Sequence, residues 1–542
     1  MLLRRKAPAA AGAANAKGAG APRAPRTTAL PMLFAALAGA LGVFAFAPFG
    51  WWPLQILALA FLFYQVGMDT SVRRASLIGW AFGFGWSVAG THWLYITMNR
   101  FGNIPGPMAV AAVCLLGAYM ALFAALATGL PTWLRKKWSL PVKPFLLLAL
   151  PFAWGLSEWM RGWVMTGFPW AASGYAHNTS PLAGYAPLVG VYGIGVIAAL
   201  CASCVAMLTQ RSRLLGAGLL AGAMAAGFGL TYIDWTQPEG KPISVRLLQG
   251  NVPQAKKFDP ETMLRSLEMY RAMVLAAPAD LIALPETAVP TLPQYLPPDY
   301  LASLQRYATS SGSHLLFGVP LTDGPGTYAN SVQGFAPHGA NGPNDPNGPN
   351  GAAYRYDKHH LVPFGEFVPA GFRWFVDMMR IPLGDMTRGA AVQPAFAVKD
   401  QRVLPNVCYE DVFGEEIALQ LRSMDKPATI LLNVSNLAWF GESVAIPQHL
   451  QMSQMRSLET GRPMLRATNS GATVVIDGRG KVTHALANYT HGALVAPVQG
   501  MRGMTPFILM GNYLMLALAA VAFAIAWIWG RWYSMAAKKR QK

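Results

Sequence analysis

The sequence has few cysteines and lacks the short motifs of several common enzyme classes. Its 542 residues contain only four cysteines, of which Cys114, Cys201 and Cys204 fall inside apolar runs and Cys408 stands apart. The C-A-S-C pair at 201–204 has no second pair, so neither a disulfide framework nor a zinc site is expected. G-x-S-x-G, Walker A and H-E-x-x-H motifs are also absent, which leaves serine-hydrolase and metal chemistry without support. We therefore predict no metal and no cofactor.

Acidic residues are scarce, and their distribution shows where the positive charge lies. The chain has 43 Lys and Arg against 25 Asp and Glu, a formal net charge of +18. Residues 241–500 hold 21 basic and 21 acidic residues, so the other 22 basic residues face only four acids. The excess lies in tails and short connections between apolar runs and not on a folded domain. We therefore predict no nucleic-acid partner.

The first 26 residues lack the large apolar side chains that a folded core needs. They are mainly Ala, Gly and Pro with scattered Lys and Arg, which predicts a disordered basic tail on the cytoplasmic side. The apolar run that follows contains A-F-A near its end, a pattern typical of signal-peptide cleavage sites. The charged region before it is too long for a signal peptide and further apolar runs follow at once, so we interpret it as a membrane anchor.

Charged residues are only 13% of the chain, whereas hydrophobic residues are 53% and the mean hydropathy is +0.30. This is not the composition of a soluble enzyme. Apolar runs long enough to cross a bilayer lie at about 27–47, 51–69, 75–98, 108–131, 143–161, 181–208, 214–233 and 505–530. The sequence therefore predicts a polytopic α-helical membrane domain with eight transmembrane helices, seven within 27–234 and one at 505–530, followed by a basic cytoplasmic tail at 531–542.

The basic residues between the apolar runs predict the orientation of the chain. They cluster in alternate connections, near residues 73–74, 135–137 and 211–213, and in both tails. Because cytoplasmic loops carry an excess of Lys and Arg, both termini are predicted to be cytoplasmic and residues 235–504 to be outside. Glu158 and Arg161, in S-E-W-M-R-G, lie near the outer end of a predicted span, and we interpret them as structural or as a contact for lipid headgroups.

From residue 243 the long apolar runs give way to short strands that alternate with helices. Strands are predicted at 243–250, 280–286, 314–320, 328–336, 352–361, 403–408, 429–435 and 472–478. Helices are predicted at 260–276, 298–311, 411–423 and 446–460. Residues 241–500 are therefore expected to form a layered α/β domain.

One cysteine occupies a position suited to a nucleophile. In R-V-L-P-N-V-C-Y-E-D-V-F-G-E-E (402–416), Cys408 lies where a buried strand passes into a helix with acids in its first turn. A thiol near a helix N-terminus has its thiolate form favoured by the helix dipole and free N–H groups. The alternative is a small buried apolar residue, because free cysteines are often buried.

Two further polar residues stand at the ends of apolar strands. Glu286 closes A-L-P-E, and Lys358 lies in Y-R-Y-D-K-H-H-L. A carboxylate, an ammonium and the Cys408 thiol on neighbouring strand ends would supply a base, an oxyanion stabiliser and a nucleophile.

These residues and their flanks carry a resemblance. Glu286, Lys358 and Cys408 resemble the Glu–Lys–Cys set of the nitrilase (carbon–nitrogen hydrolase) superfamily. Longer stretches resemble the apolipoprotein N-acyltransferase family: K-H-H-L-V-P-F-G-E-F-V-P (358–369), N-V-C-Y-E (406–410), W-F-G (439–441), Q-H-L-Q-M (448–452), A-P-F-G-W-W-P (47–53), E-W-M-R-G (158–162) and T-G-F-P-W (166–170). One departure is Leu437 in S-N-L-A-W-F-G, where we would expect an acid.

The resemblance implies a nitrilase-like αββα sandwich at 241–500 and a two-step acyl transfer at the outer, periplasmic face of a bacterial inner membrane. Cys408 would take an acyl chain from a glycerophospholipid, with phosphatidylethanolamine as the expected donor. The thioester would then pass the chain to the α-amine of a lipoprotein's diacylglyceryl-cysteine. The implied partners are thus the phospholipid, the diacylated apolipoprotein and the membrane.

The resemblance also implies roles for the site residues. Glu286 would deprotonate the thiol and later the incoming amine, and Lys358 would stabilise the oxyanion. Glu366, eight residues after Lys358, is a second carboxylate that would orient Lys358 or assist with protons. Tyr409 and Glu410 are assigned to support of the pocket.

Residues 367–388 are predicted to form a lipid-facing arm of the site. Aromatic and Met side chains are dense there for an extracytoplasmic loop: Phe372, Trp374, Phe375, Met378 and Met379. An apolar face with basic flanks suits a segment at the headgroup boundary. The alternative is an ordinary helix that packs on the core of its own domain.

Two other functional classes remain open. The first is a membrane-tethered amidase or nitrilase, in which water resolves the covalent intermediate. The second is a transporter or lipid-binding scaffold whose outer domain has lost activity. Release of fatty acid without an acceptor amine would favour the first class, and failure of a thiol probe to label Cys408 would favour the second.

Overall fold

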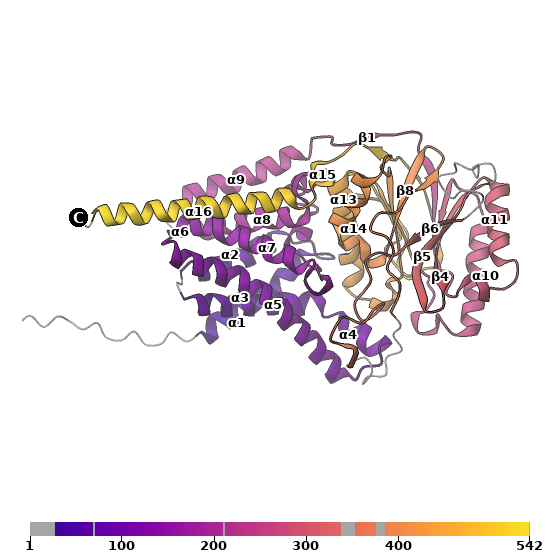
Figure 1. The fold of residues 1–542 in the computed structure, drawn as a ribbon, viewed down its shortest axis with the longest axis horizontal. Helices are drawn as coiled ribbons and strands as arrows, with labels where there is room; N and C mark the ends of the chain where they lie inside the picture. Colours follow the sequence, from indigo (N-terminus) through magenta and orange to yellow (C-terminus); the bar gives the residue numbers. More distant parts are fainter. Residues whose placement is uncertain (1–27, 69–70, 210–211, 338–352, 375–384, 541–542) are drawn as a thin grey trace, which may run out of the picture.

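The structure, a computed structural model, describes residues 28–68, 71–209, 212–337, 353–374 and 385–540. The chain forms a bundle of helices and, at one end of the bundle, a domain of two packed sheets with helices on their outer faces (Figure 1). The bundle contains residues from the start of the described chain to about 230 and the last helix, so the sheet domain is inserted before that helix.

The helices of the bundle follow the order of the predicted apolar runs. They are α1 (Ala29–Gly42), α2 (Pro53–Gly67), α3 (Val72–Thr91), α4 (Leu94–Ile96), α5 (Gly106–Lys137), α6 (Val142–Pro144), α7 (Leu150–Arg161), α8 (Ala186–Met207), α9 (Arg213–Leu230), α15 (Pro506–Met510) and α16 (Tyr513–Arg540). Helix α3 packs between α1 and α5, and α8 packs on α2 and α7. Helix α16 continues to Arg540, so most of the predicted C-terminal tail is helical.

Four helical segments among the described residues are long and apolar enough to cross a membrane. They are Gly106–Lys137, Pro181–Met207, Arg213–Leu230 and Tyr513–Arg540. The other predicted spans differ in detail: α1 and α2 have only 14 and 15 residues, and the fifth span is broken by a π-helical turn before the 12-residue α7. The apolar helices indicate a membrane protein, and the count of eight spans stays a prediction.

The sheet domain consists of two six-stranded sheets. The first has the order β13-β2-β3-β4-β5-β6 and the second β12-β11-β10-β9-β8-β7. The strands of the first are β2 (Ile243–Gln249), β3 (Leu281–Ala283), β4 (His314–Gly324), β5 (Thr327–Phe335), β6 (Tyr354–Asp357) and β13 (Gly492–Val498). Those of the second are β7 (Phe396–Val398), β8 (Gln401–Val407), β9 (Ile430–Ser435), β10 (Met464–Thr468), β11 (Val474–Ile476) and β12 (Val482–Ala485). A short pair, β1 (Gln237–Pro238) with β14 (Met501–Arg502), closes the ends of the domain.

Both sheets have a parallel centre, β2-β3-β4 in one and β8-β9-β10 in the other. Parallel strands are buried on both faces, which explains the near-continuous apolar runs that predicted them. The carboxyl ends of parallel strands meet at one edge of a sheet, so Glu286 after β3, Lys358 after β6 and Cys408 after β8 can converge. Strand β6 ends at Asp357, four residues before the predicted end.

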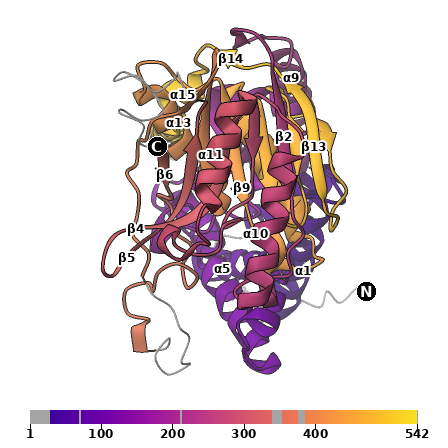
Figure 2. The same ribbon diagram turned by 90° about the vertical axis from the view of Figure 1, so that its right-hand side faces the viewer.

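Helices cover the outer face of each sheet. Helices α10 (Pro260–Leu275) and α11 (Tyr300–Ser311) lie in front of the first sheet in Figure 2, and α13 (Gly414–Ser423) and α14 (Ala445–Thr460) lie between the second sheet and the bundle in Figure 1. The inner faces pack together through residues such as Leu247, Leu281 and Val407. The result is the predicted αββα sandwich, with all four predicted helices present.

The turn that carries Cys408 is built into the contact between sandwich and bundle. Tyr409, Val412 and Phe413 belong to the same apolar core as the bundle helices. The Tyr409 hydroxyl donates to the carbonyl of Gly167, 3.1 Å away. Helix α8 breaks at Gly190, whose φ of +63° and contact with the Phe507 ring leave no room for a Cβ.

The break in α8 frees a backbone N–H that the sandwich satisfies. The Val191 N–H donates to Glu459 Oε1 at 2.8 Å, and the same carboxylate pairs with Arg456 at 3.0 Å. Arg456 in turn donates to the carbonyl of Val412 at 3.0 Å. A chain of hydrogen bonds thus runs from a bundle helix to the turn that follows Cys408.

Candidate active site

Cys408 is held in a strained turn directly after β8. Its φ of +52° lies in the left-handed region, which costs a non-glycine residue about 1–3 kcal/mol and persists only when neighbours fix it. Two bonds do so here. The Val407 N–H donates to Glu410 Oε2 at 2.6 Å, and Asn433 Nδ2 donates to the Cys408 carbonyl at 3.0 Å. These two bonds hold Cys408 in its left-handed conformation at the end of β8.

The expected stabilisation of the Cys408 thiolate by a helix dipole is wrong. Cys408–Val412 form a short 3₁₀ turn, and the following helix begins only at Gly414. Burial raises the pKa of the Cys408 thiol well above its usual value, the Glu286 carboxylate raises it further, and Lys358 opposes them. The resting residue is a protonated thiol, so attack requires a base within the site.

Glu286 and Lys358 lie together, as predicted, and Glu366 joins them. The Lys358 Nζ is 2.9 Å from the Glu366 carboxylate and 3.7 Å from Glu286 Oε1, and Lys358 is 1% exposed. Although burial acts to lower it, the charges of Glu366 and Glu286 raise the pKa of Lys358. The same three groups act electrostatically on the Cys408 thiol. Lys358 is therefore a permanent cation between two carboxylates and beside the thiol.

Asn330, which the sequence analysis did not single out, orients both carboxylates. Its Nδ2 donates to Glu286 Oε1 and to Glu366 Oε1, each at 2.8 Å. The main-chain carbonyl of Asn330 accepts the main-chain N–H of Lys358 at 2.8 Å. The second oxygen of Glu286 accepts the Asn436 N–H at 2.9 Å. The only sequence signal was an amide inside the otherwise buried strand β5.

Glu366 owes its position to the turn that precedes it. Its Oε2 accepts the N–H of Val362 at 2.8 Å, so the L-V-P-F-G-E segment folds back and returns the carboxylate to Lys358. This places Glu366 as the second carboxylate at Lys358, the position that the resemblance implied for it.

Glu410 connects the cysteine turn to the loop that carries Lys358. Its carboxylate accepts the N–H groups of Val407, His359 and His360, at 2.6, 2.6 and 3.1 Å, and the hydroxyl of Tyr356 at 3.0 Å. Burial raises the pKa of Glu410 to about 7, and the backbone donors oppose this. Glu410 thus fixes Cys408 relative to Lys358.

A second lysine lies at the site and was not singled out from the sequence. Lys257 is buried, and its Nζ donates to the main-chain carbonyl of Glu286 at 3.3 Å. In the sequence it follows β2, in N-V-P-Q-A-K-K-F. Nothing in this pattern distinguishes it from its exposed neighbour Lys256. Its electrostatic partners are Glu286 and Cys408.

Part of the predicted arm can be placed. Phe372 and Trp374 are 38% and 64% exposed, and the Phe372 ring packs edge-on against Phe364. Phe375, Met378 and Met379 lie outside the described residues. Leu437, where we expected an acid, is fully buried in a small apolar cluster with Ile446 and Ala472, so this position takes no part in the polar site.

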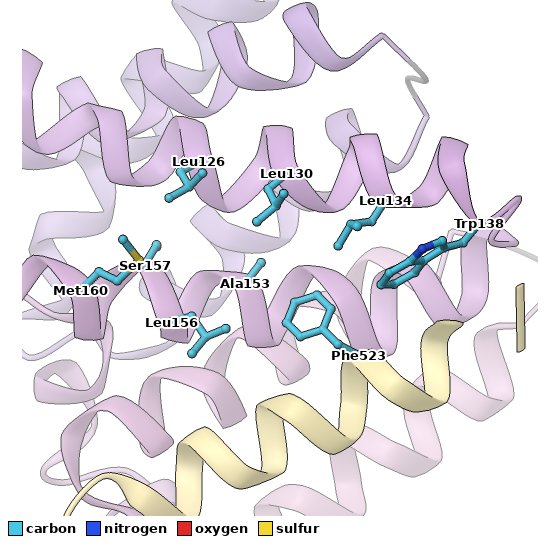
Figure 3. Close-up of a pocket in the computed structure, with 9 residues that line it drawn as sticks. All are labelled: Leu126, Leu130, Leu134, Trp138, Ala153, Leu156, Ser157, Met160 and Phe523. Atoms are coloured by element: carbon cyan, nitrogen blue, oxygen red, sulfur yellow. The ribbon is translucent and has the colours of Figure 1, made fainter. Parts of the chain in front are cut away.

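The bundle contains apolar space. A groove of about 240 Å³ runs between α5, α7 and α16 (Figure 3) and is lined by Leu126, Leu130, Leu134, Trp138, Ala153, Leu156, Ser157, Met160 and Phe523. Nearby, Glu158 Oε1 accepts the N–H and hydroxyl of Ser173, at 2.8 and 2.7 Å, and lies 4.0 Å from Arg161. These bonds agree with the structural interpretation of Glu158.

Two solved structures match about half of this chain at low similarity. An amidase of Nesterenkonia AN1 from the nitrilase superfamily is 17% identical, with a TM-score of 0.36, and covers 52% of this chain and 98% of its own. A CN-hydrolase superfamily protein from Xanthomonas campestris is 16% identical, also with a TM-score of 0.36, over 52% of this chain and 97% of its own.

Family models and curated relatives match far more of the chain. The model of the apolipoprotein N-acyltransferase N-terminal domain matches residues 38–204, and that of carbon-nitrogen hydrolase matches residues 244–505. The apolipoprotein N-acyltransferase of Ralstonia nicotianae is 49% identical over 93% of this chain and 94% of its own. That of Bordetella bronchiseptica is 42% identical over 92% and 97%, and that of Nitrosomonas europaea 42% over 90% and 95%. With both of its parts matched and such relatives along nearly its full length, this chain belongs to the apolipoprotein N-acyltransferase family.

Proposed function

We propose that this enzyme transfers an acyl chain from a glycerophospholipid to the N-terminal α-amine of the diacylglyceryl-cysteine of lipoproteins. The transfer passes through a thioester on Cys408. One observation carries the proposal: a buried Glu286–Lys358–Glu366 cluster acts on a thiol held at φ +52°, in a chain of this family. A covalent intermediate lets one site serve two bulky amphiphiles in turn.

In the first step Glu286 is the base. Its carboxylate takes the proton of the Cys408 thiol as Sγ attacks the carbonyl carbon of the phospholipid ester, and the ester C=O becomes a tetrahedral oxyanion. Lys358 stabilises the oxyanion. The oxyanion collapses with cleavage of the ester C–O bond, and the leaving alkoxide takes the proton back from Glu286. The products are the Cys408 thioester and a lysophospholipid.

In the second step the lipoprotein amine replaces the ester. The neutral α-amine attacks the thioester carbonyl and gives its proton to Glu286, and Lys358 again faces an oxyanion. Collapse breaks the C–S bond, forms the amide and releases the Cys408 thiolate, which is reprotonated from Glu286. Both steps use the same base, Glu286, and the same cation, Lys358. This agrees with the short distances from the Lys358 Nζ to Glu286 and Glu366.

We further propose the membrane setting and the donor. The positive charge of the connections supports a site on the periplasmic side of an inner membrane, with both termini cytoplasmic. Phosphatidylethanolamine is the proposed acyl donor. The cysteine turn contacts the bundle through Tyr409 and Phe413, which supports access to the thiol from the edge of the bilayer.

Intact-mass analysis of the purified chain tests the proposal. With phosphatidylethanolamine present, Cys408 should gain the mass of one acyl chain, and hydroxylamine should remove it. A diacylated lipopeptide with a free α-amine should clear the adduct and become triacylated. Absence of the adduct contradicts the proposal. Equal release of free fatty acid with and without the lipopeptide would instead identify a hydrolase.

Glu286→Gln is expected to slow acylation of Cys408 by about 10²- to 10⁴-fold, because the amide cannot accept the thiol proton. Its oxygen can still accept the Asn436 N–H, but its NH2 group would face the Asn330 donor, so the melting temperature of the variant is measured as well. Single-turnover formation of the acyl adduct measures the effect. Glu268→Gln, an exposed acid on α10, is the matched control and should acylate normally. A normal rate for Glu286→Gln would remove this residue from the role of base.

The double change Phe372→Ser and Trp374→Ser tests the arm. Both rings are exposed, and seating one aromatic ring in lipid is worth about 1.5–3 kcal/mol, so use of bilayer phospholipid should fall by about tenfold or more. Alkylation of Cys408 by a small soluble reagent should not change. Tyr295→Ser, an exposed ring in another loop, should affect neither assay. Equal losses in both assays would show that the arm is only structural.

A further inference from the structure

Lys257 is a buried cation in the loop that follows β2. It is 4% exposed, and its Nζ donates a hydrogen bond to the main-chain carbonyl of Glu286 at 3.3 Å. No carboxylate among the residues that the structure describes lies within ion-pair distance of this Nζ. A buried ammonium is costly unless a negative charge compensates it. Its neighbour Lys256 is exposed and has no such cost.

The compensating charge is found at the active site. Lys358 is the single cation between two carboxylates, at 2.9 Å from Glu366 and 3.7 Å from Glu286. One ammonium balances one carboxylate, so this cluster has one negative charge in excess. The other buried acids of the described residues are already provided for. Asp411 pairs with Arg466 at 2.8 Å and Glu459 with Arg456 at 3.0 Å, Glu158 lies 4.0 Å from Arg161, and Glu410 accepts three main-chain N–H groups.

We propose that Lys257 is a positioning residue of the acyl-transfer site, whose ammonium balances the second carboxylate and holds the backbone of the base Glu286. This inference rests on the proposed function. During attack, the negative charge moves from Glu286 to the oxyanion beside Lys358, while Lys257 keeps the buried site neutral throughout. Without it, the site has a net negative charge that opposes formation of both thiolate and oxyanion.

The charge of Lys257 gives the enzyme an alkaline limit. Burial lowers the pKa of Lys257 to about 8, against the opposing effects of Glu286 and Cys408. The groups that face it are these two and, next to them, Lys358 and Glu366; on its own loop Lys256 and Asp259 are exposed. Lys257 is therefore charged below about pH 8 and neutral above, so acylation should fall as pH rises through about 8.

The test compares the full-length wild type with Lys257→Met, Lys257→Arg and, as the matched control, Lys256→Met. The first readout is alkylation of Cys408 by iodoacetamide at pH 7, followed by peptide mass analysis. The second is the rate of acyl-adduct formation from phosphatidylethanolamine between pH 6 and 10. We expect Lys257→Met to slow both reactions by about 10- to 100-fold and to lose the alkaline fall. Lys256→Met should match the wild type.

Lys257→Arg separates charge from packing. Arginine stays protonated over this range, so this variant should keep most of the rate at pH 7 and should not decline near pH 8. The proposal is overturned if Lys257→Met alkylates and acylates like Lys256→Met, or if its rate still falls near pH 8. A wild type that alkylates but forms no acyl adduct would overturn the proposed function, and the alkylation rates would still decide the role of Lys257.

Discussion

Cys408→Ser is expected to abolish acyl transfer, with a loss on the order of 10⁵-fold, while the protein stays folded. A serine alkoxide is far harder to form than a thiolate. Burial already raises the pKa of the thiol at this position, and the same environment would oppose an alkoxide more strongly. Glu286, the proposed base, is too weak to deprotonate a hydroxyl. Turnover of diacylated lipopeptide and intact mass measure the loss.

The other three cysteines provide the controls for this experiment. Cys201 and Cys204 are buried in α8, and Cys114 lies in α5. Their replacement by alanine, one at a time, should leave acyl transfer unchanged, because none of them lies in the sandwich. Near-normal turnover by Cys408→Ser, with an unchanged melting temperature, would contradict the thioester mechanism.

Lys358→Met is expected to reduce the rate of both half-reactions, by about 10²- to 10³-fold, because each passes through an oxyanion that Lys358 stabilises. The methionine side chain has a similar length but no charge. Single-turnover acylation of Cys408 and deacylation by lipopeptide should therefore slow together. A Lys358→Met variant that acylates at the normal rate would show that its role is misassigned.

The same change should also lower stability. Lys358 is 1% exposed and lies between Glu286 and Glu366, and removal of one partner from a buried ion pair typically costs about 3–5 kcal/mol. We therefore expect a lower melting temperature. Lys481→Met, on an exposed loop, should change neither stability nor rate.

Much of the sandwich could be predicted from local patterns. Helix α10 has its own N-cap residue in the sequence, because the Asp259 side chain accepts the N–H of Thr262. Strand β10 was missed because its buried Arg466, neutralised by Asp411, breaks the apolar run that marks a strand. Strand β13 was missed because it contains Pro497, which is tolerated there only because β13 lies at the edge of its sheet.

The candidate site was predictable in part, at positions where polar residues end apolar strands. Glu286, Lys358 and Cys408 fit this pattern. In the structure the Lys358 ammonium lies between the carboxylates of Glu286 and Glu366. Asn330 and Lys257 do not fit it. Asn330 bonds to residues that follow other strands of its own sheet, and Lys257 stands out by its burial, and no local pattern records either property. The predicted stabilisation of the Cys408 thiolate was wrong for the same reason: burial raises the pKa of the thiol and outweighs any effect of the turn that follows it.

The bonds between bundle and sandwich bear on whether the sandwich can be separated from the membrane part. Tyr409, Val412 and Phe413 share their core with the bundle, and Glu459 is bonded to Val191 at the break in α8. Cutting the chain on either side of the sandwich would open the apolar floor of the cysteine turn to water and leave Glu459 and Arg456 without the helix they meet. A soluble fragment is therefore expected to aggregate or to lose the strained turn at Cys408.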